Sequence, residues 1–373
     1  MIYKPFGNTG IQISQLGFGC MRLPGAHVDG KFQPDQEKVD QMLMRAYELG
    51  VNYFDTAPGY CDGNSEIAVG KALKGIRDKV YISTKCSIKE SGDELRRDLE
   101  QSLRKLDTDY VDFYHFWGIG RNQYENLFPL KDGPVPAALK AKEEGLIKHL
   151  SFSFHDSPDV MMKIIDTGLF ESVLCQFNLL DRANEEAIAY AQEKGLGVVI
   201  MGPVAGGRIG APSDTIASML PGKVESSAEI ALRFVMATKG VSCALSGMSN
   251  MDMVEENCKV ASIETPLTAE ERRRIDKALD ENKKLAELYC TGCKYCMPCP
   301  QGVNIPLNFE AMNYHKVYGL TQHAKNIYRD IKPEHNRGEK ADKCIECGLC
   351  EAKCPQKIEI RKQLKEVALA LGE

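Results

Sequence analysis

Several features that mark common functional classes are missing from this sequence. Basic side chains number 47 against 52 acidic ones, a formal net charge of −5, so the basic surplus typical of nucleic-acid binding is absent. No apolar run reaches the ~18 residues of a membrane span. The first ten residues, MIYKPFGNTG, contain no apolar core of a secretory leader. We therefore expect a cytoplasmic protein that binds neither nucleic acid nor membrane.

A dinucleotide-binding glycine motif is also lacking. The first glycine-rich stretch, GFGCMR at 17–22, does not match the GxGxxG pattern of a Rossmann fold. Apolar runs instead alternate with segments of helical spacing, which is typical of a parallel sheet covered on both faces. The runs lie at Ser14–Phe18, Val51–Asp55, Val80–Thr84, Val111–Trp117, His149–Ser153, Val173–Gln176, Gly197–Met201 and Ser242–Ser246. Eight such units predict an α/β fold, a closed (β/α)8 TIM barrel. Residues 1–12 are expected to form a hairpin that plugs its bottom.

The 14 cysteines are unevenly distributed. Six are scattered over the first 260 residues, and without a secretory signal we expect them to be reduced and mostly buried. The other eight lie in two runs, CTGCKYCMPCP (290–300) and CIECGLCEAKCP (344–355). The second run has the C-x2-C-x2-C-x3-C-P spacing of bacterial ferredoxins, and the first is one residue shorter in its last gap. Two such runs predict two [4Fe–4S] clusters.

The spacing also divides the cysteines between the clusters. In two-cluster ferredoxins the fourth cysteine of each run ligates the other cluster. We therefore assign cluster one to Cys290, Cys293, Cys296 and Cys354, and cluster two to Cys299, Cys344, Cys347 and Cys350. The alternative is zinc, which C-x2-C pairs also bind. Zinc sites close with four ligands in pairs, whereas each run here holds four cysteines and ends in Cys-Pro.

Domain boundaries follow from these patterns. We expect a barrel over residues 1–265, a linking helix over 266–288 and an iron–sulfur domain over 289–373. The linking helix opens with Thr268 and has Glu271 three residues later, which is a capping-box pattern. Residues 301–343 and the closing stretch have helical character. This favours a C-terminal α-helical ferredoxin-like iron–sulfur domain over the compact hairpin-rich kind.

The ends of the predicted strands carry candidate chemistry. Active sites of TIM barrels form at the carboxyl ends of the strands. Asp55 and Lys85 end the second and third strands, and Tyr60 follows Asp55 in the next loop. We expect Lys85 to lower the pKa of the Tyr60 hydroxyl and Asp55 to orient the lysine. Tyr60 could then give a proton to a carbonyl oxygen while hydride reaches the carbon.

Longer stretches around these residues resemble the aldo-keto reductase superfamily. They include GVNYFDTAPGY (50–60), VYISTK (80–85), SLRKLDTDYVDFY (102–114), QFNLL (176–180) and SGMSNMDMVEEN (246–257). The resemblance covers about residues 1–265, and the whole chain resembles the subgroup that carries a C-terminal ferredoxin domain. It implies that Asp55, Tyr60 and Lys85 are catalytic. It also implies cofactor-binding roles for Ser153, Gln176, Gly202, Gly206, Gly207, Ser246, Gly247, Met248 and Asn257.

The sequence departs from the family pattern at the strand ends. The histidine expected five residues after Asp112 is replaced by Trp117. Because side chains alternate along a strand, His115 is expected on the same inward face one layer deeper, where it remains a candidate catalytic group. Trp117, His155 and Cys61 are expected to line the substrate pocket. Met201 replaces the aromatic residue that stacks on nicotinamide, and Phe154 follows Ser153 where the family has asparagine.

Several interpretations remain open at this stage. No Lys or Arg lies between Leu245 and Asn257, which favours NAD(H) over NADP(H). One hypothesis is a nicotinamide-dependent reductase of a small carbonyl substrate, in which Tyr60 is the acid and the two [4Fe–4S] clusters are an electron relay or a structural staple. The second is a cluster-driven reductase in which a flavin or radical chemistry couples one-electron and two-electron steps. The third is an electron carrier on an altered barrel. A redox partner protein is expected in the last two.

Overall fold

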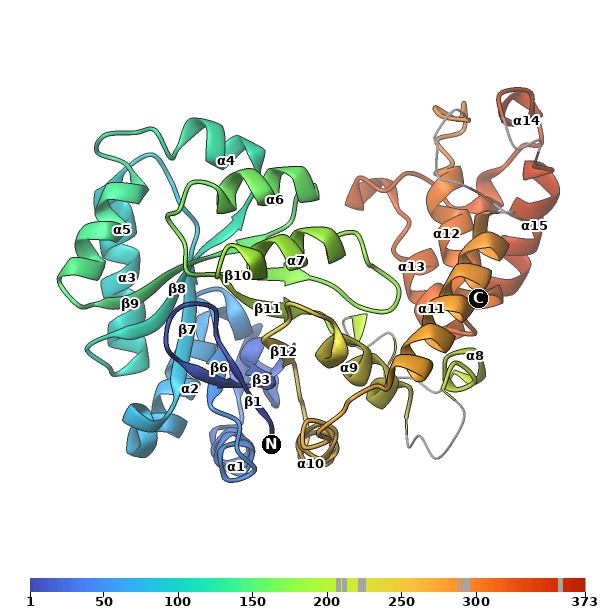
Figure 1. Ribbon diagram of the computed structural model, residues 1–373. Helices are drawn as coiled ribbons and strands as arrows, with labels where there is room; N and C mark the ends of the chain where they lie inside the picture. Colours follow the sequence, from blue (N-terminus) through green and yellow to red (C-terminus); the bar gives the residue numbers. More distant parts are fainter. Residues whose placement is uncertain are drawn as a thin grey trace. The chain divides into compact units, whose positions relative to one another are not determined.

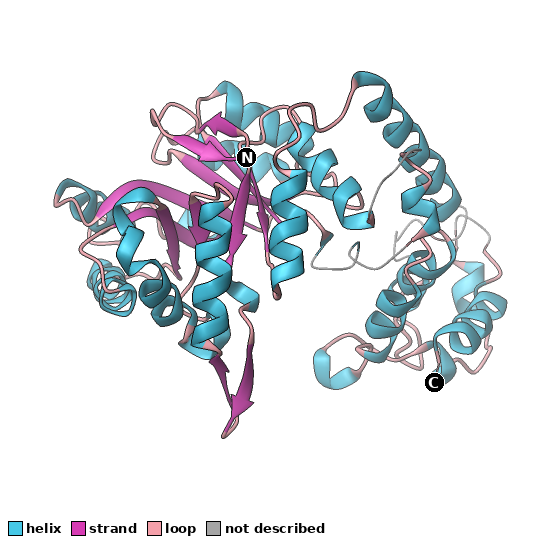
Figure 2. Cartoon of the chain, turned by 90° about the horizontal axis from the view of Figure 1, so that it is seen from below, coloured by secondary structure: helices cyan, strands magenta, loops and turns pink. Residues whose placement is uncertain are grey.

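The computed structural model describes residues 1–205, 209, 213–220, 226–287, 290, 296–354 and 358–372. The chain divides into two compact units. The first contains residues 1–206 and 231–267, and the second contains residues 207–230 and 268–373 (Figure 1). Strands gather in the first unit, whereas helices make up the second (Figure 2). Within the described residues, no helix has the length and apolar character needed to cross a membrane.

The first unit is a closed barrel of eight parallel strands, which confirms the predicted fold. Each of the eight apolar runs contributes one strand. In chain order the strands are β3 (Leu16–Gly19), β6 (Tyr53–Asp55), β7 (Tyr81–Cys86), β8 (Val111–Ile119), β9 (Ile147–Phe154), β10 (Ser172–Gln176), β11 (Gly197–Met201) and β12 (Cys243–Ser246). β12 pairs with β3, which closes the barrel.

Helices alternate with these strands and cover them. They are α1 (Gln36–Glu48), α2 (Ser65–Leu73), α3 (Gly92–Leu106), α4 (Arg121–Asn126), α5 (Pro134–Glu143), α6 (Pro158–Ile165), α7 (Glu185–Glu193), α9 (Ser227–Ala237) and α10 (Met251–Val260). α3 shows why they pack. Its buried Leu95, Leu99 and Leu103 recur every four residues and form one apolar face. The helix ends at Asp107, whose backbone is left-handed and whose N–H bonds the last carbonyls.

Two antiparallel hairpins accompany the barrel. β1 (Tyr3–Pro5) pairs with β2 (Gln12–Ser14), as expected for the N-terminal segment. Phe6 from this hairpin joins a buried cluster of inward-facing barrel side chains that includes Tyr53 and Phe113. The hairpin therefore fills one end of the barrel. A second hairpin, β4 (Gly25–Val28) with β5 (Lys31–Pro34), follows the short helix η1 (Cys20–Arg22) and was not predicted.

The second unit is helical. Its helices are α8 (Asp214–Ala217), α11 (Ala269–Glu287), α12 (Ile305–Lys316), α13 (Thr321–Arg329), α14 (Leu349–Ala352) and α15 (Ile360–Leu371). α11 begins with the predicted capping box: the Thr268 N–H donates to Glu271 Oε2 at 2.7 Å, and the Glu271 N–H donates to Thr268 Oγ1 at 3.2 Å. A small apolar core that includes Phe309 and Val367 joins α12, α13 and α15.

One segment joins this unit from far away in the sequence. Residues 207–230, which follow β11 in the chain, belong to the second unit. There the Ser213 hydroxyl caps α8 and also donates a hydrogen bond of 2.6 Å to the Tyr318 carbonyl. The predicted domain boundaries placed these residues in the barrel, because the local sequence gives no sign of the contact between Ser213 and Tyr318.

Candidate active site and cysteine pocket

A buried ion pair lies at the carboxyl ends of β6 and β7. Lys85 Nζ is 2.7 Å from both carboxylate oxygens of Asp55 and 2.7 Å from the Thr56 carbonyl oxygen. These three contacts match the three N–H donors of an ammonium group. Ser83 adds a hydroxyl that donates to Asp55 Oδ1 at 2.7 Å. Lys85 and Asp55 are each only 1% exposed, so both charges are held apart from water and fixed in place.

Tyr60 lies beside this pair. It opens the short helix η2 (Tyr60–Gly63), and its ring centre is 4.8 Å from Lys85 Nζ. Burial raises the pKa of Tyr60 above its ordinary value, Lys85 opposes that shift, and Asp55 reinforces it. The expected net lowering of this pKa is therefore wrong, since burial outweighs the lysine. Burial would lower the pKa of Lys85, but Asp55 and Tyr60 raise it on balance. At neutral pH the phenol keeps its proton next to a charged ammonium.

Trp117 stands over Tyr60 at the end of β8. The two rings meet edge to face, with centroids 5.9 Å apart and an interplanar angle of 90°. β8 is irregular here: its register with β9 shifts between Phe116 and Ile119, and Gly118 between them has a φ of +61°. Glycine adopts that left-handed backbone without the steric cost that a Cβ would add. The bulge interrupts the regular pairing of β8 with β9 after Phe116, and the indole of Trp117 is partly exposed beside the tyrosine.

His115 lies deeper, opposite Lys85 in the register of β7 and β8. It is fully buried, and its Nε2 is 3.4 Å from the hydroxyl of Tyr53. Its Nδ1 has no hydrogen bond of regular geometry. Burial first and then the charge of Lys85 lower its pKa well below the ordinary histidine value, while the Phe152 main chain opposes this. His115 thus remains neutral inside the barrel, as expected for an inward-facing residue one layer below Trp117.

The predicted nicotinamide residues lie at the ends of β9, β10 and β12. The Ser153 hydroxyl accepts a hydrogen bond of 2.7 Å from the Gly118 N–H, which ties it to the bulge. Gln176 is partly exposed, and its amide lies so close to Gly202 that a Cβ there would meet it at 2.7 Å. Asn257 on α10 donates to the Ser246 hydroxyl at 3.1 Å.

The remaining predicted cofactor residues are less informative. The Met248 side chain is fully buried. A Cβ added at Gly247 would meet nothing closer than the Gly19 carbonyl oxygen at 3.8 Å, so the space above this glycine is open. Gly206 and Gly207 fall outside the described residues.

The other two predicted pocket residues differ in their setting. Cys61 directly follows Tyr60 and has a left-handed backbone, with φ of +52°. Its thiol is 3.8 Å from the Cys20 carbonyl oxygen and 3.7 Å from that of Met21, so it contacts the segment after β3. His155 follows β9 and is exposed. Ser83 and Tyr53 were not predicted as site residues, although each lies two positions before Lys85 or Asp55 and so shares its strand face.

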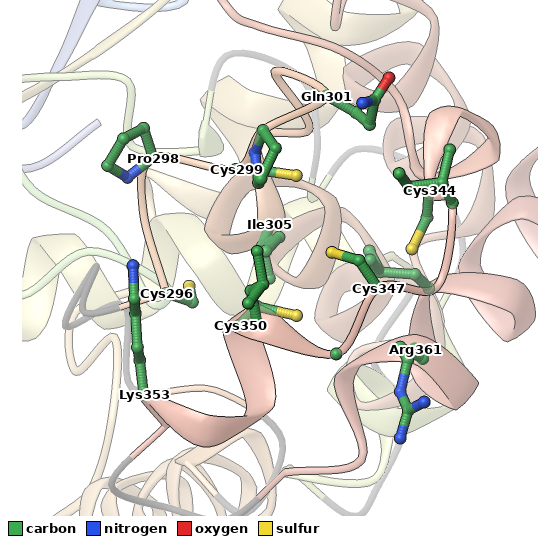
Figure 3. A pocket seen from close by; sticks show the side chains of 15 residues that line it. Cys296, Pro298, Cys299, Gln301, Ile305, Cys344, Cys347, Cys350, Lys353 and Arg361 are labelled. Carbon is green, nitrogen blue, oxygen red and sulfur yellow. The ribbon is translucent and has the colours of Figure 1, made fainter.

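Five of the cysteines line one pocket of the second unit. Its walls include Cys296, Cys299, Cys344, Cys347 and Cys350. In Figure 3 the thiols of Cys299, Cys344, Cys347 and Cys350 surround a common space, while that of Cys296 lies apart. These four are the set predicted for cluster two. The fit to a thiolate-bound cluster is good, because the buried side chains of Ile305 and Leu364 give the same pocket apolar walls.

The loop that carries three of these cysteines wraps tightly. Glu346 and Gly348 both have left-handed backbones, with φ of +60° and +75°. They alternate with Cys347, so the chain turns between successive thiols. The Glu346 N–H donates to Cys344 Sγ at 3.4 Å. Main-chain N–H groups directed at sulfur are one of the means by which proteins adjust iron–sulfur potentials.

The other predicted cluster set is only partly described. Cys290, Cys296 and Cys354 pack against the apolar core of the second unit, whereas Cys293 lies outside the described residues. Among the described residues, no three His, Cys, Asp or Glu side chains are arranged around a single metal ion. Four thiolates around a [4Fe–4S] cube bind four different irons, so their sulfurs do not converge on one point.

Comparison with known families agrees with both the barrel and the cysteine-rich second unit. The aldo/keto reductase family matches residues 15–280, and the 4Fe-4S dicluster domain matches residues 289–359. L-galactose dehydrogenase of Arabidopsis thaliana is 29% identical over 283 residues, covering 68% of this chain and 86% of the relative. The NADH-specific methylglyoxal reductase of Escherichia coli is 28% identical over 227 residues, covering 54% of this chain and 67% of the relative.

Solved structures show the same fold. An aldo-keto reductase from Bacillus halodurans, in its holo form, superimposes with a TM-score of 0.65 at 31% identity, covering 74% of this chain and 96% of the other. An aldo-keto reductase from Klebsiella pneumoniae in complex with NADPH gives a TM-score of 0.61 at 26% identity, covering 74% of this chain and 95% of the other. The chain therefore belongs to the aldo/keto reductase family, and it is an oxidoreductase with a C-terminal 4Fe–4S dicluster domain.

Proposed function

We propose that this enzyme reduces a small carbonyl compound at the mouth of the barrel, with Tyr60 as the proton donor. The observation that carries the proposal is the position of a neutral phenol next to the buried Lys85–Asp55 pair. A bound nicotinamide would supply the hydride. Tyr60 would give its proton to the substrate oxygen as that oxygen gains negative charge.

Lys85 and Asp55 would support the proton donor without leaving their places. The fixed ammonium stabilises the phenolate that Tyr60 becomes after it gives up its proton, because opposite charges attract strongly where water is excluded. Asp55 and the Thr56 carbonyl hold the ammonium still throughout. The ammonium of Lys85 therefore stabilises the phenolate of Tyr60, which exists only after proton transfer to the substrate oxygen has begun.

We propose that Ser153, Gln176 and Asn257 help to hold the nicotinamide cofactor. Their polar side chains lie at or beside the ends of β9, β10 and β12, where barrel enzymes bind ligands. NADH is favoured over NADPH because residues 245–257 contain no basic side chain that could bind a 2′-phosphate. The relatives are divided on this point, since one is named NADH-specific and another was solved with NADPH.

We propose that the second unit holds two [4Fe–4S] clusters that exchange single electrons with a partner. Cluster two would be held by Cys299, Cys344, Cys347 and Cys350, whose thiols surround the pocket of Figure 3. Cluster one would be held by Cys290, Cys293, Cys296 and Cys354. We propose a barrel domain over residues 1–265, with residues 207–230 excepted, a linking helix at 266–288 and a cluster domain over 289–373.

The proposal is tested by removing one hydroxyl. Tyr60→Phe should lower kcat for NADH-dependent carbonyl reduction by about 10²–10⁴-fold, while iron and sulfide contents stay unchanged. Tyr190→Phe is the matched control, because its hydroxyl bonds Asp166 on an outer face of the barrel unit. Unchanged turnover in Tyr60→Phe would exclude the tyrosine as the acid.

A second candidate is favoured by Trp117. The indole occupies the strand end where the family pattern expects a histidine, and it covers the tyrosine that would meet the substrate. Such a mouth also suits a reductase driven by the clusters, with a flavin or radical substrate coupling the electrons. Anaerobic titration with NADH, monitored by EPR, distinguishes the two. Clusters that are reduced by a partner and drive turnover without nicotinamide would favour the second candidate.

A further inference from the structure

We propose that the surface around Cys347 is the docking site for an acidic protein that carries one electron at a time. We call this surface the carrier face and define it by Ile345, Cys347, Leu349, Lys353 and Arg361. The inference rests on the proposed presence of cluster two in the adjacent pocket. It adds the place of electron exchange and the chemistry of the partner, neither of which follows from the family of the chain.

Two large apolar side chains of the carrier face are exposed. Ile345 is 62% exposed and Leu349 is 55% exposed, although both are large apolar side chains. Single exposed hydrophobic residues are common on proteins and require no explanation. Here the two lie two positions before and two positions after Cys347, which is itself exposed, and all three line the same pocket. Apolar side chains gathered at a surface in this way are typical of protein interfaces.

The thiol of Cys347 lies nearer to the surface than the other three thiols assigned to cluster two. Electron transfer slows steeply with distance, so a cluster exchanges electrons fastest where it comes nearest to the surface. Cys347 is exposed, whereas Cys299, Cys344 and Cys350 are only partly so. The edge of cluster two bound by Cys347 would therefore be the closest approach for an external protein. A partner seated on Ile345 and Leu349 would cover that edge.

Within the part of the chain that the structure describes, the charged side chains around the carrier face leave one lysine unpaired. The acidic side chains beside the face are neutralised by ion pairs: Glu351 with Arg361 at 2.7 Å, and Glu346 with Lys365 at 2.8 Å. Lys353 lines the pocket and has no ion-pair partner among the described residues. A [4Fe–4S] cluster with four thiolate ligands carries a net negative charge, so the positive charge of the face lies at its rim, on Lys353. At that rim Lys353 favours contact with an acidic partner over contact with a basic one.

Together these features fit a brief encounter between proteins. Weak redox complexes bury less than about 1,200 Å² in total, and their association depends on charge and salt. A small apolar centre with one unpaired lysine at its rim matches that class. A tight, permanent subunit would require a larger apolar area.

The test uses the complete protein with its clusters intact. Reduced plant-type [2Fe–2S] ferredoxin, an acidic one-electron carrier, is mixed anaerobically with the oxidised enzyme in a stopped-flow instrument. Ile345→Glu and Lys353→Glu should each lower the second-order rate of cluster reduction by about tenfold or more, because each adds repulsion at the face. Raising the ionic strength should slow the unaltered protein. Reduction by methyl viologen, which needs no docking surface, should stay within twofold in every variant.

Leu369→Glu is the matched control. Leu369 is 86% exposed on α15 of the same unit and does not line the pocket. The same charge added there should leave the ferredoxin rate unchanged. Equal rates for Ile345→Glu and Leu369→Glu would overturn the proposal. So would a slower NADH-driven reduction of the clusters in Ile345→Glu with an unaltered ferredoxin rate, because the face would then serve electron transfer within the chain.

The docking proposal and the proposed function fail in different ways. If methyl viologen reduces the clusters normally while every variant reacts with ferredoxin at the same rate, the proposal of two clusters is kept and the proposal of the carrier face is rejected. If purified protein contains neither iron nor acid-labile sulfide, the clusters themselves are absent, and both proposals fall together.

Discussion

The two sites of this chain are built in opposite ways. In the barrel, Asp55 and Lys85 come from separate strands and meet through the topology, and their charges are fixed by hydrogen bonds before any ligand arrives. In the second unit, three pocket cysteines come from one loop of seven residues, Cys344–Cys350, and their thiols face a space with no direct bonds among them. The first site is organised by the fold. The second is organised by what it binds.

This difference predicts where each site is vulnerable. Most of the buried apolar side chains lie in the barrel, Phe113 and Leu174 among them, so the barrel fold does not depend on one ligand. The second unit has fewer buried apolar side chains, and Cys299, Cys344 and Cys350 pack against them. Metal binding contributes folding energy directly in domains of this kind. Loss of a cluster should therefore lower the stability of the second unit. Loss of a catalytic side chain should lower the activity of the barrel and leave its fold intact.

The largest expected effect comes from removing one thiol. Cys350→Ser should eliminate cluster two and lower the iron content from about eight to about four atoms per chain. We expect increased proteolysis of the second unit and an unchanged barrel, measured by limited digestion and mass spectrometry. Cys175→Ala, a buried barrel cysteine, is the control and should keep full iron. Unfolding of both units in Cys350→Ser would contradict the claim that only the second unit depends on a cluster for its fold.

Asp55→Asn tests the barrel side of the comparison. It leaves the buried ammonium of Lys85 without its countercharge, which costs about 3–5 kcal/mol when one partner of a buried pair is removed. Urea unfolding can be followed through Trp117, because the chain contains a single tryptophan and it lies at this site. Asp166→Asn, at an exposed ion pair with Lys194, should change the midpoint little. Equal stability of the two variants would mean that the buried pair is not fixed as described.

His115→Gln sharpens the question of whether this histidine is catalytic. The pKa of His115 is lower in the folded state than the ~6.5 of an unfolded chain. Below pH ~6.5 the unfolded chain takes up a proton that the folded chain refuses, so stability falls by up to about 1.4 kcal/mol per pH unit until the folded pKa is reached. His115→Gln should flatten this slope, measured by urea unfolding from pH 5 to pH 7.

The activity of the same variant separates its roles. We expect kcat to fall by less than about tenfold, because His115 contacts Tyr53 in the layer below the site. His27→Gln, at an exposed position on β4, is the matched control and should leave kcat unchanged. A fall of a hundredfold or more in His115→Gln, without loss of stability at neutral pH, would assign the histidine to the chemistry.

The smallest effect is expected at Cys61. A left-handed backbone costs a residue with a Cβ roughly 1–2 kcal/mol, and glycine is free of that cost. Cys61→Gly should therefore stabilise the barrel by about 0.5–1 kcal/mol, measured as a rise in the thermal midpoint. Cys61→Ala keeps the strained backbone and removes only the thiol, so it should give no gain. A gain in both variants would trace the effect to the thiol.

Much of the architecture was predictable because the signals are local. Each barrel strand is a short apolar run, and the cysteine runs have a spacing that few other sites share. The hairpin β4–β5 was missed although Asp29-Gly30 is a strong turn signal, since its strands have only four residues each and bury no side chain in the barrel core. It is tied to the segment after Tyr60, where the Phe32 N–H donates to Asp62 Oδ2 at 2.7 Å.

Other features depend on the folded environment and leave no trace in a local pattern. The bulge at Gly118 requires a pairing register that only the closed barrel defines. The pKa of Tyr60 was predicted with the wrong sign, because the neighbouring lysine is evident in the sequence and the depth of burial is not. The place of residues 207–230 in the second unit likewise depends on a contact with Tyr318, far along the chain.

The saturation of Lys85 by three acceptors has a consequence for selectivity. An unprotonated lysine would condense with an aldehyde to form an imine, which would inactivate the carbonyl reductase proposed above. The raised pKa of Lys85 keeps it protonated, and its N–H groups are already occupied by Asp55 and Thr56. The amine has no lone pair to offer. The same contacts that hold the charge in place thereby make the lysine inert toward the compounds that enter beside it.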